Sequence, residues 1–171
     1  MNSSTRLLMA AALSLTLVAC SNKPKPTPPV EDNTPPPVVD TTPVQDNGRY
    51  TPADLDTDSC LRQRVVYFDF DQSTIRPEFQ EIMACHAKYL QDRPSARITL
   101  EGHADERGTR EYNLGLGERR GNAVSDALSA SGGSASQLTT VSYGEERPVC
   151  MESGDSCWSR NRRVEIVYTA Q

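Results

Sequence analysis

A proline-rich segment limits the part of this chain that can fold to the residues that follow it. Eight of the twelve prolines lie within residues 21–49, which hold almost no large apolar side chains. Such a composition buries too little apolar surface to offset the entropy lost on ordering, and it favours extended polyproline II. We therefore predict a disordered tether over residues 20–49 and one folded domain over residues 50–171. A PxxP site for a partner is the alternative to a passive spacer.

The first 19 residues have the pattern of a secretory signal peptide. Arg6 precedes an apolar run from Leu7 to Ala19, which is too short to span a bilayer. The run ends in Leu17-Val18-Ala19-Cys20, which resembles the bacterial lipobox and implies that Cys20 is lipidated after cleavage. In lipoproteins of this type, an aspartate after the cysteine often means retention in the inner membrane. Ser21 stands there instead, so we expect an anchor in the outer membrane. The alternative is an ordinary secretory signal in which the cysteine is incidental.

The charge of the folded part argues against one class of partner. Residues 50–171 carry 14 basic and 19 acidic side chains. Nucleic-acid binding needs a basic surface, so we expect no nucleic-acid partner.

Four cysteines follow the proline-rich segment, and an even number in an exported domain indicates disulfides. Three pairings are possible. Cys150–Cys157 is favoured because it closes a short loop, which leaves Cys60–Cys85 as the second pair. A zinc site is the alternative, but the chain has no C-x-x-C spacing and only two histidines that could assist. We therefore expect no metal site.

Apolar residues recur with strand and helix periods in alternation along the folded part. We predict strands at residues 64–70, 97–101, 139–143 and 163–168, one long helix from Pro77 to about Pro94, and another over residues 111–130. Strands alternating with helices predict an α/β sandwich, with a mixed four-stranded sheet and helices packed on one face.

The stretch from Glu101 to Thr109 places an acid, Asp105, after one of these strands. Arg120 follows fifteen positions later on the second long helix. An acid and an arginine at this spacing can hold a zwitterion, with ammonium on the carboxylate and carboxylate on the guanidinium.

Five segments together resemble the family of OmpA-like peptidoglycan-binding domains. They are Val66–Asp71, Glu101–Thr109, Leu116–Arg120, Val141–Pro148 and Asn161–Arg163. The resemblance covers about residues 65–168. It implies a non-enzymatic domain without cofactor that binds the stem peptide of peptidoglycan through meso-diaminopimelate. It also implies an outer-membrane lipoprotein that tethers the membrane to the cell wall, serves envelope integrity and membrane constriction at cell division, and has TolB and other Tol proteins as partners.

The resemblance also implies a set of site residues. Asp105 would accept the ammonium group, and Arg120 would take the carboxylate as a bidentate pair. Asn113 lies two helical turns before Arg120, on the same face and near the helix N-terminus, where a carboxylate is favoured. Asp71 would close one wall of the pocket with its backbone. Arg163 is expected to support the site or to contact a sugar.

Alternatives remain for these residues. Asp105 could cap a helix and Asp71 could simply form a turn. His103, Asp105 and Glu106 could form a hydrolase site, although no serine or cysteine nucleophile stands in a recognisable motif. The domain could also be a protein-interaction or structural module that has lost wall binding, but both Asp105 and Arg120 are present, which argues against this.

Two further features have no role in this interpretation. Glu106 and Arg107 are interpreted as a local ion pair, worth little at a surface. Gly121 lies inside the second long helix, where glycine costs about 1 kcal/mol relative to alanine, and nothing in the pattern explains it.

Overall fold

The structure, a computed structural model, describes residues 48–171. The predicted signal peptide, the lipidation site Cys20 and nearly all of the predicted tether lie outside these residues. The elements of the described part are α1 (Asp54–Thr57), β1 (Val65–Tyr67), η1 (Pro77–Phe79), α2 (Gln80–Asp92), β2 (Arg97–His103), α3 (Arg110–Ala130), η2 (Ala135–Gln137), β3 (Leu138–Gly144), α4 (Asp155–Asn161) and β4 (Arg163–Ala170). Within the described range, no helix is long and apolar enough to cross a membrane.

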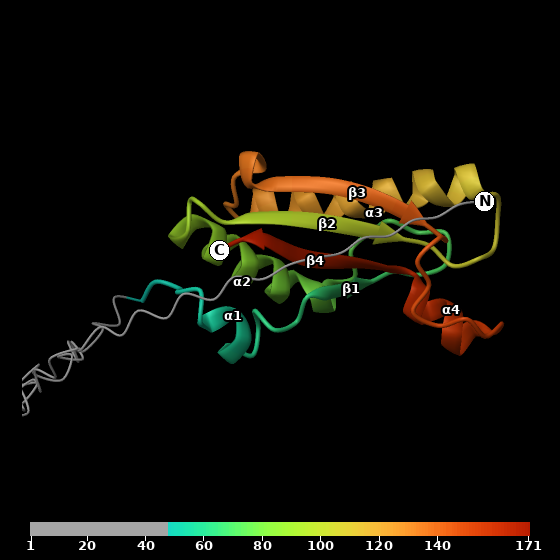
Figure 1. Ribbon diagram of the computed structural model, residues 1–171, viewed down its shortest axis with the longest axis horizontal. Helices are drawn as coiled ribbons and strands as arrows, with labels where there is room; N and C mark the ends of the chain where they lie inside the picture. Colours follow the sequence, from blue (N-terminus) through green and yellow to red (C-terminus); the bar gives the residue numbers. More distant parts are fainter. Residues whose placement is uncertain (1–47) are drawn as a thin grey trace, which may run out of the picture. The chain divides into compact units, whose positions relative to one another are not determined.

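The four strands form one mixed sheet in the order β1-β4-β2-β3 (Figure 1). Strand β2 is parallel to β3 and antiparallel to β4, which in turn is antiparallel to β1. In the register, Ile98 of β2 lies opposite Leu138 on one side and Tyr168 on the other. The predicted mixed four-stranded sheet is therefore confirmed.

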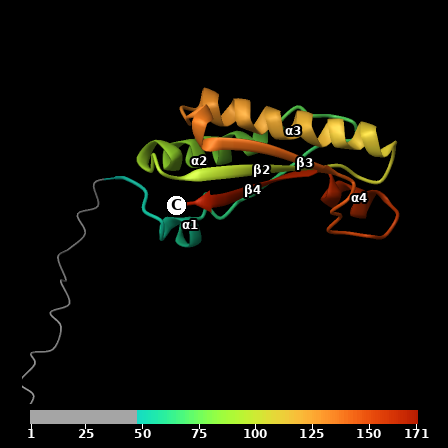
Figure 2. The same ribbon diagram turned by 45° about the horizontal axis from the view of Figure 1, so that its top comes forward.

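The two long helices, α2 and α3, lie on the same face of this sheet, as expected (Figure 2). Pro77 begins the helical segment, where its missing N–H needs no partner. The apolar side of α2 is buried against the core through Ile82, Met83 and Leu90, and Val124 and Leu128 of α3 join the same core. Leu55 of the short helix α1 joins this core as well, and the sequence pattern predicted neither α1 nor the other short helix, α4.

Helix α3 approaches the sheet closely, and this explains Gly121. A methyl group at Gly121 would lie 2.5 Å from Cγ2 of Thr140 in β3, which is far inside ordinary contact. Any larger residue at this position would require the Thr140 side chain or the helix to shift. The helix-propensity cost of this glycine is thus offset by the close packing that it permits.

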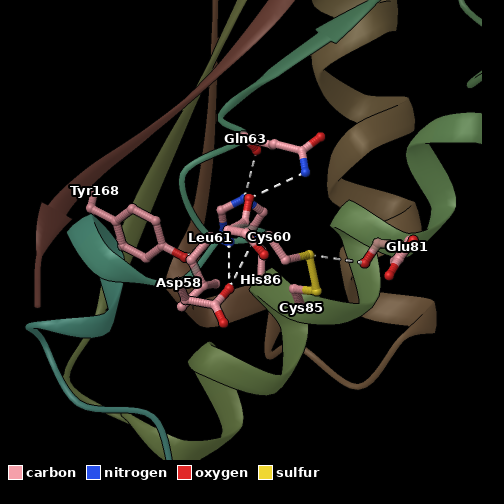
Figure 3. The surroundings of a disulfide bond; sticks show 9 residues. Asp58, Cys60, Leu61, Gln63, Glu81, Cys85, His86 and Tyr168 are labelled. Atoms are coloured by element: carbon pink, nitrogen blue, oxygen red, sulfur yellow. Dashed lines mark hydrogen bonds between the residues drawn. A yellow bond between two sulfur atoms is a disulfide. The ribbon is translucent and has the colours of Figure 1, made fainter.

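Both expected disulfides are present. Cys60–Cys85 joins the segment after α1 to α2, and Cys150–Cys157 joins the loop after β3 to α4. Figure 3 shows the surroundings of the first disulfide, where His86 lies between Tyr168 and the backbone of Gln63.

The first strand is shorter than predicted. Strand β1 ends at Tyr67, although the apolar pattern continues to Phe70. The N–H of Phe68 still donates to the carbonyl of Arg162, at 2.9 Å. The chain then turns, and Asp71 adopts a left-handed backbone conformation with φ of 57°. This turn carries Phe70 and Asp71 toward the start of α3.

Candidate functional site

A cavity of about 220 Å³ lies where the loops after β1 and β2 meet the first turns of α3. Its lining residues are Phe70, Asp71, Asp105, Arg107, Gly108, Tyr112, Asn113, Leu116 and Arg120. Four of the five expected site residues, Asp71, Asp105, Asn113 and Arg120, therefore line one cavity.

Asp105 is buried at this cavity and is already paired with arginine. Arg107 donates from Nε to Oδ1 at 3.0 Å, from Nη2 to Oδ2 at 2.7 Å and from its backbone N–H to Oδ1 at 3.1 Å. Arg162 donates from Nη1 to Oδ2 at 3.3 Å. Burial raises the pKa of Asp105, but the hydrogen bonds from Arg107 and Arg162 outweigh it, so the pKa lies below its ordinary value. Asp105 is thus a carboxylate held ionised by two guanidinium groups.

The guanidinium of Arg107 is stacked between two aromatic rings. It lies 4.0 Å from the ring centroid of Phe70 and 4.1 Å from that of Trp158. The expected ion pair between Glu106 and Arg107 is wrong, because Arg107 turns to Asp105. Glu106 instead accepts hydrogen bonds from Nε1 of Trp158 at 2.9 Å and from Oγ of Ser153 at 3.1 Å. Its carboxylate thereby holds α4 and the disulfide loop against the site.

Arg120 is fully buried beneath the cavity. It donates to the backbone carbonyls of Gln72 at 2.8 Å, His103 at 2.8 Å and Asp69 at 3.0 Å. Burial lowers the pKa of Arg120 to about 10, which leaves it charged at neutral pH. Its guanidinium therefore fastens the loop after β1 to the end of β2, and so builds the wall that carries Asp71.

Asn113 and Asp71 also line the cavity. The side-chain amide of Asn113 donates to Glu145, while its Oδ1 is buried without a hydrogen-bond partner in the described part of the chain. A buried unpaired acceptor at a cavity is costly unless a ligand or water supplies a donor. Asp71 accepts a hydrogen bond from the hydroxyl of Tyr112, which joins the loop after β1 to the first turn of α3.

Arg163, expected at the same site, does not line the cavity. It donates to Glu165 at 2.7 Å and to the carbonyl of Arg147 at 3.2 Å. The neighbouring Arg162 reaches Asp105 instead. Both arginines are buried, Arg162 at the C-terminal cap of α4 and Arg163 at the start of β4. A supporting role for Arg163 stays a prediction.

The residues of the hydrolase alternative point in different directions. His103 packs on the ring of Tyr143, with centroids 5.5 Å apart, and does not line the cavity. Burial lowers its pKa to about 4. Glu106 faces Trp158, as described above. Among residues 48–171, no three His, Cys, Asp or Glu side chains gather as a metal site would require.

Comparisons with known proteins point to one family. The model of the OmpA family matches residues 67–162. A peptidoglycan-associated lipoprotein of Pasteurella multocida is 37% identical over 164 residues, which is 96% of this chain and 97% of that protein. One of Brucella melitensis is 50% identical over 102 residues, 60% of this chain and 61% of that protein, so the match spans about three fifths of it.

A solved structure is also similar. The crystal structure of the peptidoglycan-associated lipoprotein of Burkholderia pseudomallei superposes with a TM-score of 0.66 at 42% identity, covering 68% of this chain and 98% of that one. These relatives are named for an association with peptidoglycan rather than for a reaction, which agrees with the expectation that the chain is not an enzyme.

Proposed function

The chain belongs to the OmpA family, and from this we propose that it binds peptidoglycan non-covalently through the cavity between the loop after β1 and the start of α3. One observation supports this most strongly: a buried carboxylate, Asp105, lies beside two guanidinium groups in a cavity that a small ligand can enter. The names of the relatives point to the same polymer.

The chemistry of the cavity favours a ligand that carries both charges. Asp105 and Asp71 are suited to an ammonium group, and the unpaired Oδ1 of Asn113 offers a further acceptor. Arg107 offers a guanidinium to a carboxylate, and Arg120, which the family resemblance assigns to the carboxylate, lines the same cavity. The free end of meso-diaminopimelate, in the stem peptide of peptidoglycan, carries both groups on one carbon. We therefore propose this amino-acid end as the ligand.

The proposal extends to the whole chain. Cys20 would carry the lipid that holds the outer membrane, and residues 20–49 would span up to ~90 Å at ~3.1 Å per residue. The domain would then tether that membrane to the wall as part of the Tol–Pal system, with TolB as a partner, and would serve envelope integrity and membrane constriction at division. Many weak contacts along one polymer give high avidity.

Co-sedimentation with purified peptidoglycan sacculi tests the proposal. The full chain in mild detergent should pellet with sacculi, and Asp105→Asn should weaken this by about tenfold or more, because it removes the charge that an ammonium needs. Asp126→Asn, on the exposed side of α3, is the matched control and should pellet like the wild type. Folded wild type that stays in solution would favour the alternative, a protein-interaction module without wall binding.

Competition with TolB tests the partner. Soluble TolB should release the chain from sacculi if both use this cavity. Pelleting of both proteins together, without release, would show that TolB uses another surface.

A further inference from the structure

We propose that Arg107 recognises the carboxylate of the ligand, and that it leaves Asp105 to do so when the ligand's ammonium arrives. This inference rests on the proposed function and assigns a role to a residue that the family resemblance did not single out. Three observations carry it: the saturation of Asp105, the stacked position of Arg107 and the burial of Arg120.

Asp105 has no acceptor left for an incoming ammonium. A carboxylate offers about four lone-pair positions. Oδ1 accepts from Nε and from the backbone N–H of Arg107, while Oδ2 accepts from Nη2 of Arg107 and from Arg162. A ligand ammonium can therefore reach Asp105 only by replacing one of these donors.

Arg107 is the donor that can yield. Its side chain is 32% exposed, whereas that of Arg162 is 9% exposed. Arg162 is also fixed by a hydrogen bond from Nε to the carbonyl of Phe68, at 3.1 Å. The side-chain hydrogen bonds of Arg107 within residues 48–171 both go to Asp105. Withdrawal of Arg107 therefore leaves no backbone carbonyl unpaired.

The aromatic rings keep the released guanidinium at the site. Stacking on Phe70 and Trp158 involves the faces of the guanidinium, and its N–H edge can turn from Asp105 to a ligand while both stacks persist. Trp158 is itself held by the hydrogen bond of its Nε1 to Glu106 and by the adjacent Cys157, which is in a disulfide. Phe70 and Trp158 thus position Arg107.

Arg120 is less suited to bind the carboxylate. It is 0% exposed, and three of its N–H groups donate to backbone carbonyls that shape the cavity. Turning it toward a ligand would break these bonds. Exchange at Arg107 instead keeps every charge paired: Asp105 passes from guanidinium to ammonium, and Arg107 passes from Asp105 to the ligand carboxylate.

The exchange predicts a specific selectivity. A stem peptide with L-lysine in place of meso-diaminopimelate carries the ammonium but lacks the carboxylate. Its binding would displace Arg107 without giving it a new anion. Arg107 should therefore be the residue by which the site distinguishes the two peptides.

Calorimetric titration of the full chain in detergent tests this with two muropeptides that differ only in that residue. The wild type should prefer the diaminopimelate peptide by about tenfold or more. In Arg107→Gln, we expect that peptide to bind about tenfold more weakly and the lysine peptide to bind equally well or more tightly, so that the preference is lost. Arg110→Gln, which alters an exposed arginine paired with Glu146 outside the cavity, should leave both affinities unchanged.

A second readout needs no variant. Trp158 is the sole tryptophan of the chain, so its fluorescence reports the stack on Arg107. Emission should change with the diaminopimelate peptide and with free meso-diaminopimelate, because the N–H edge of Arg107 turns within the stack.

Several results would overturn the inference. If Arg107→Gln changes the affinity for both peptides by the same factor, Arg107 does not bind the carboxylate. It then either competes with the ligand's ammonium for Asp105 or has only a structural role. A wild type that binds both peptides equally would refute the inference while the proposed function stands. A folded wild type that binds neither peptide would refute the proposed function itself, and the inference with it.

Discussion

Gly102 of β2 and Gly117 of α3 lie so close that a methyl group on Gly102 would come within 2.6 Å of the carbonyl carbon of Gly117. A methyl group on Gly117 would in turn lie 2.9 Å from the carbonyl oxygen of Gly102. This contact brings the end of β2, which leads to Asp105, against the helix that carries Arg120. The geometry of the site therefore depends on two residues without side chains.

Gly102→Ala should destabilise the protein by about 3 kcal/mol, because backbone and not a flexible side chain fills the space. Urea unfolding measures the change. Gly115→Ala is the matched control on the same helix, since its methyl group would meet only the end of the Arg119 side chain, at 3.3 Å. That substitution should be neutral or stabilise by up to about 1 kcal/mol. Equal effects of the two substitutions would contradict the packing account.

Arg120→Met should lower the free energy of unfolding by about 3–5 kcal/mol. The substitution leaves three backbone carbonyls, at Asp69, Gln72 and His103, without their donor. Arg119→Met, one position earlier on the exposed side, should cost less than about 1 kcal/mol. Denaturant titration of both variants decides the point, and an Arg120→Met variant as stable as Arg119→Met would refute the structural role of Arg120.

The two disulfides should differ in what they stabilise. Cys60 and Cys85 are 25 positions apart and Cys150 and Cys157 are 7 apart, so loop closure predicts losses of about 3.5 and about 2.5 kcal/mol when each pair is changed to serine. Only the second pair adjoins Trp158. Thermal unfolding and muropeptide binding, measured on both double variants, should show weakened binding only for the second. Weakened binding in the Cys60/Cys85 double variant as well would mean that loss of a disulfide weakens binding by lowering the stability of the whole domain.

Acid should destabilise the protein through His86. Its Nε2 donates to the carbonyl of Gln63 and its Nδ1 accepts from the hydroxyl of Tyr168, as in a neutral ring. Burial lowers its pKa from 6.5 to about 4. Between these values the unfolded state binds more protons, so this contribution is present above about pH 6.5 and is lost as the pH falls toward about 4.

The corresponding measurement is the free energy of unfolding at about pH 7.5 and about pH 4.5. The wild type should lose stability between the two, and His86→Gln should lose about 2 kcal/mol less, because it removes the titrating group. Burial shifts the pKa of His103 in the same direction, so part of the loss should remain in the variant. An unchanged loss in His86→Gln would contradict the assignment.

The sequence pattern was sufficient for the sheet and for α2 and α3, because burial imposes regular periods on them. Helices α1 and α4 have 4 and 7 residues and were not predicted. Elements this short contain at most about two helical turns, too few for a repeating apolar pattern to be recognised. Helix α4 also contains Cys157 of the second disulfide, so its position depends on tertiary contacts. Gly121 could be explained only by the position of Thr140 on another element.

The family resemblance named Asp71, Asp105, Asn113 and Arg120, which line one cavity, but it did not reveal how Asp105 is paired. The partner of Arg107 depends on where Phe70 and Trp158 come to lie, and this is set by contacts between distant segments. Arg162 was not singled out from the sequence either. It lies at the C-terminal cap of α4, before β4 begins, so the alternation of the strand does not predict where its side chain points.

The most direct test of the proposed function is to map the ligand onto the protein by NMR. The full chain in detergent would be titrated with a muropeptide that contains meso-diaminopimelate, while its backbone amide signals are followed. We predict the largest shifts at residues that line the cavity, among them Phe70, Gly108 and Asn113. Shifts centred instead on the groove between α2 and α3, at Ile75, Met83 and Ala127, or no shifts at all, would contradict the account.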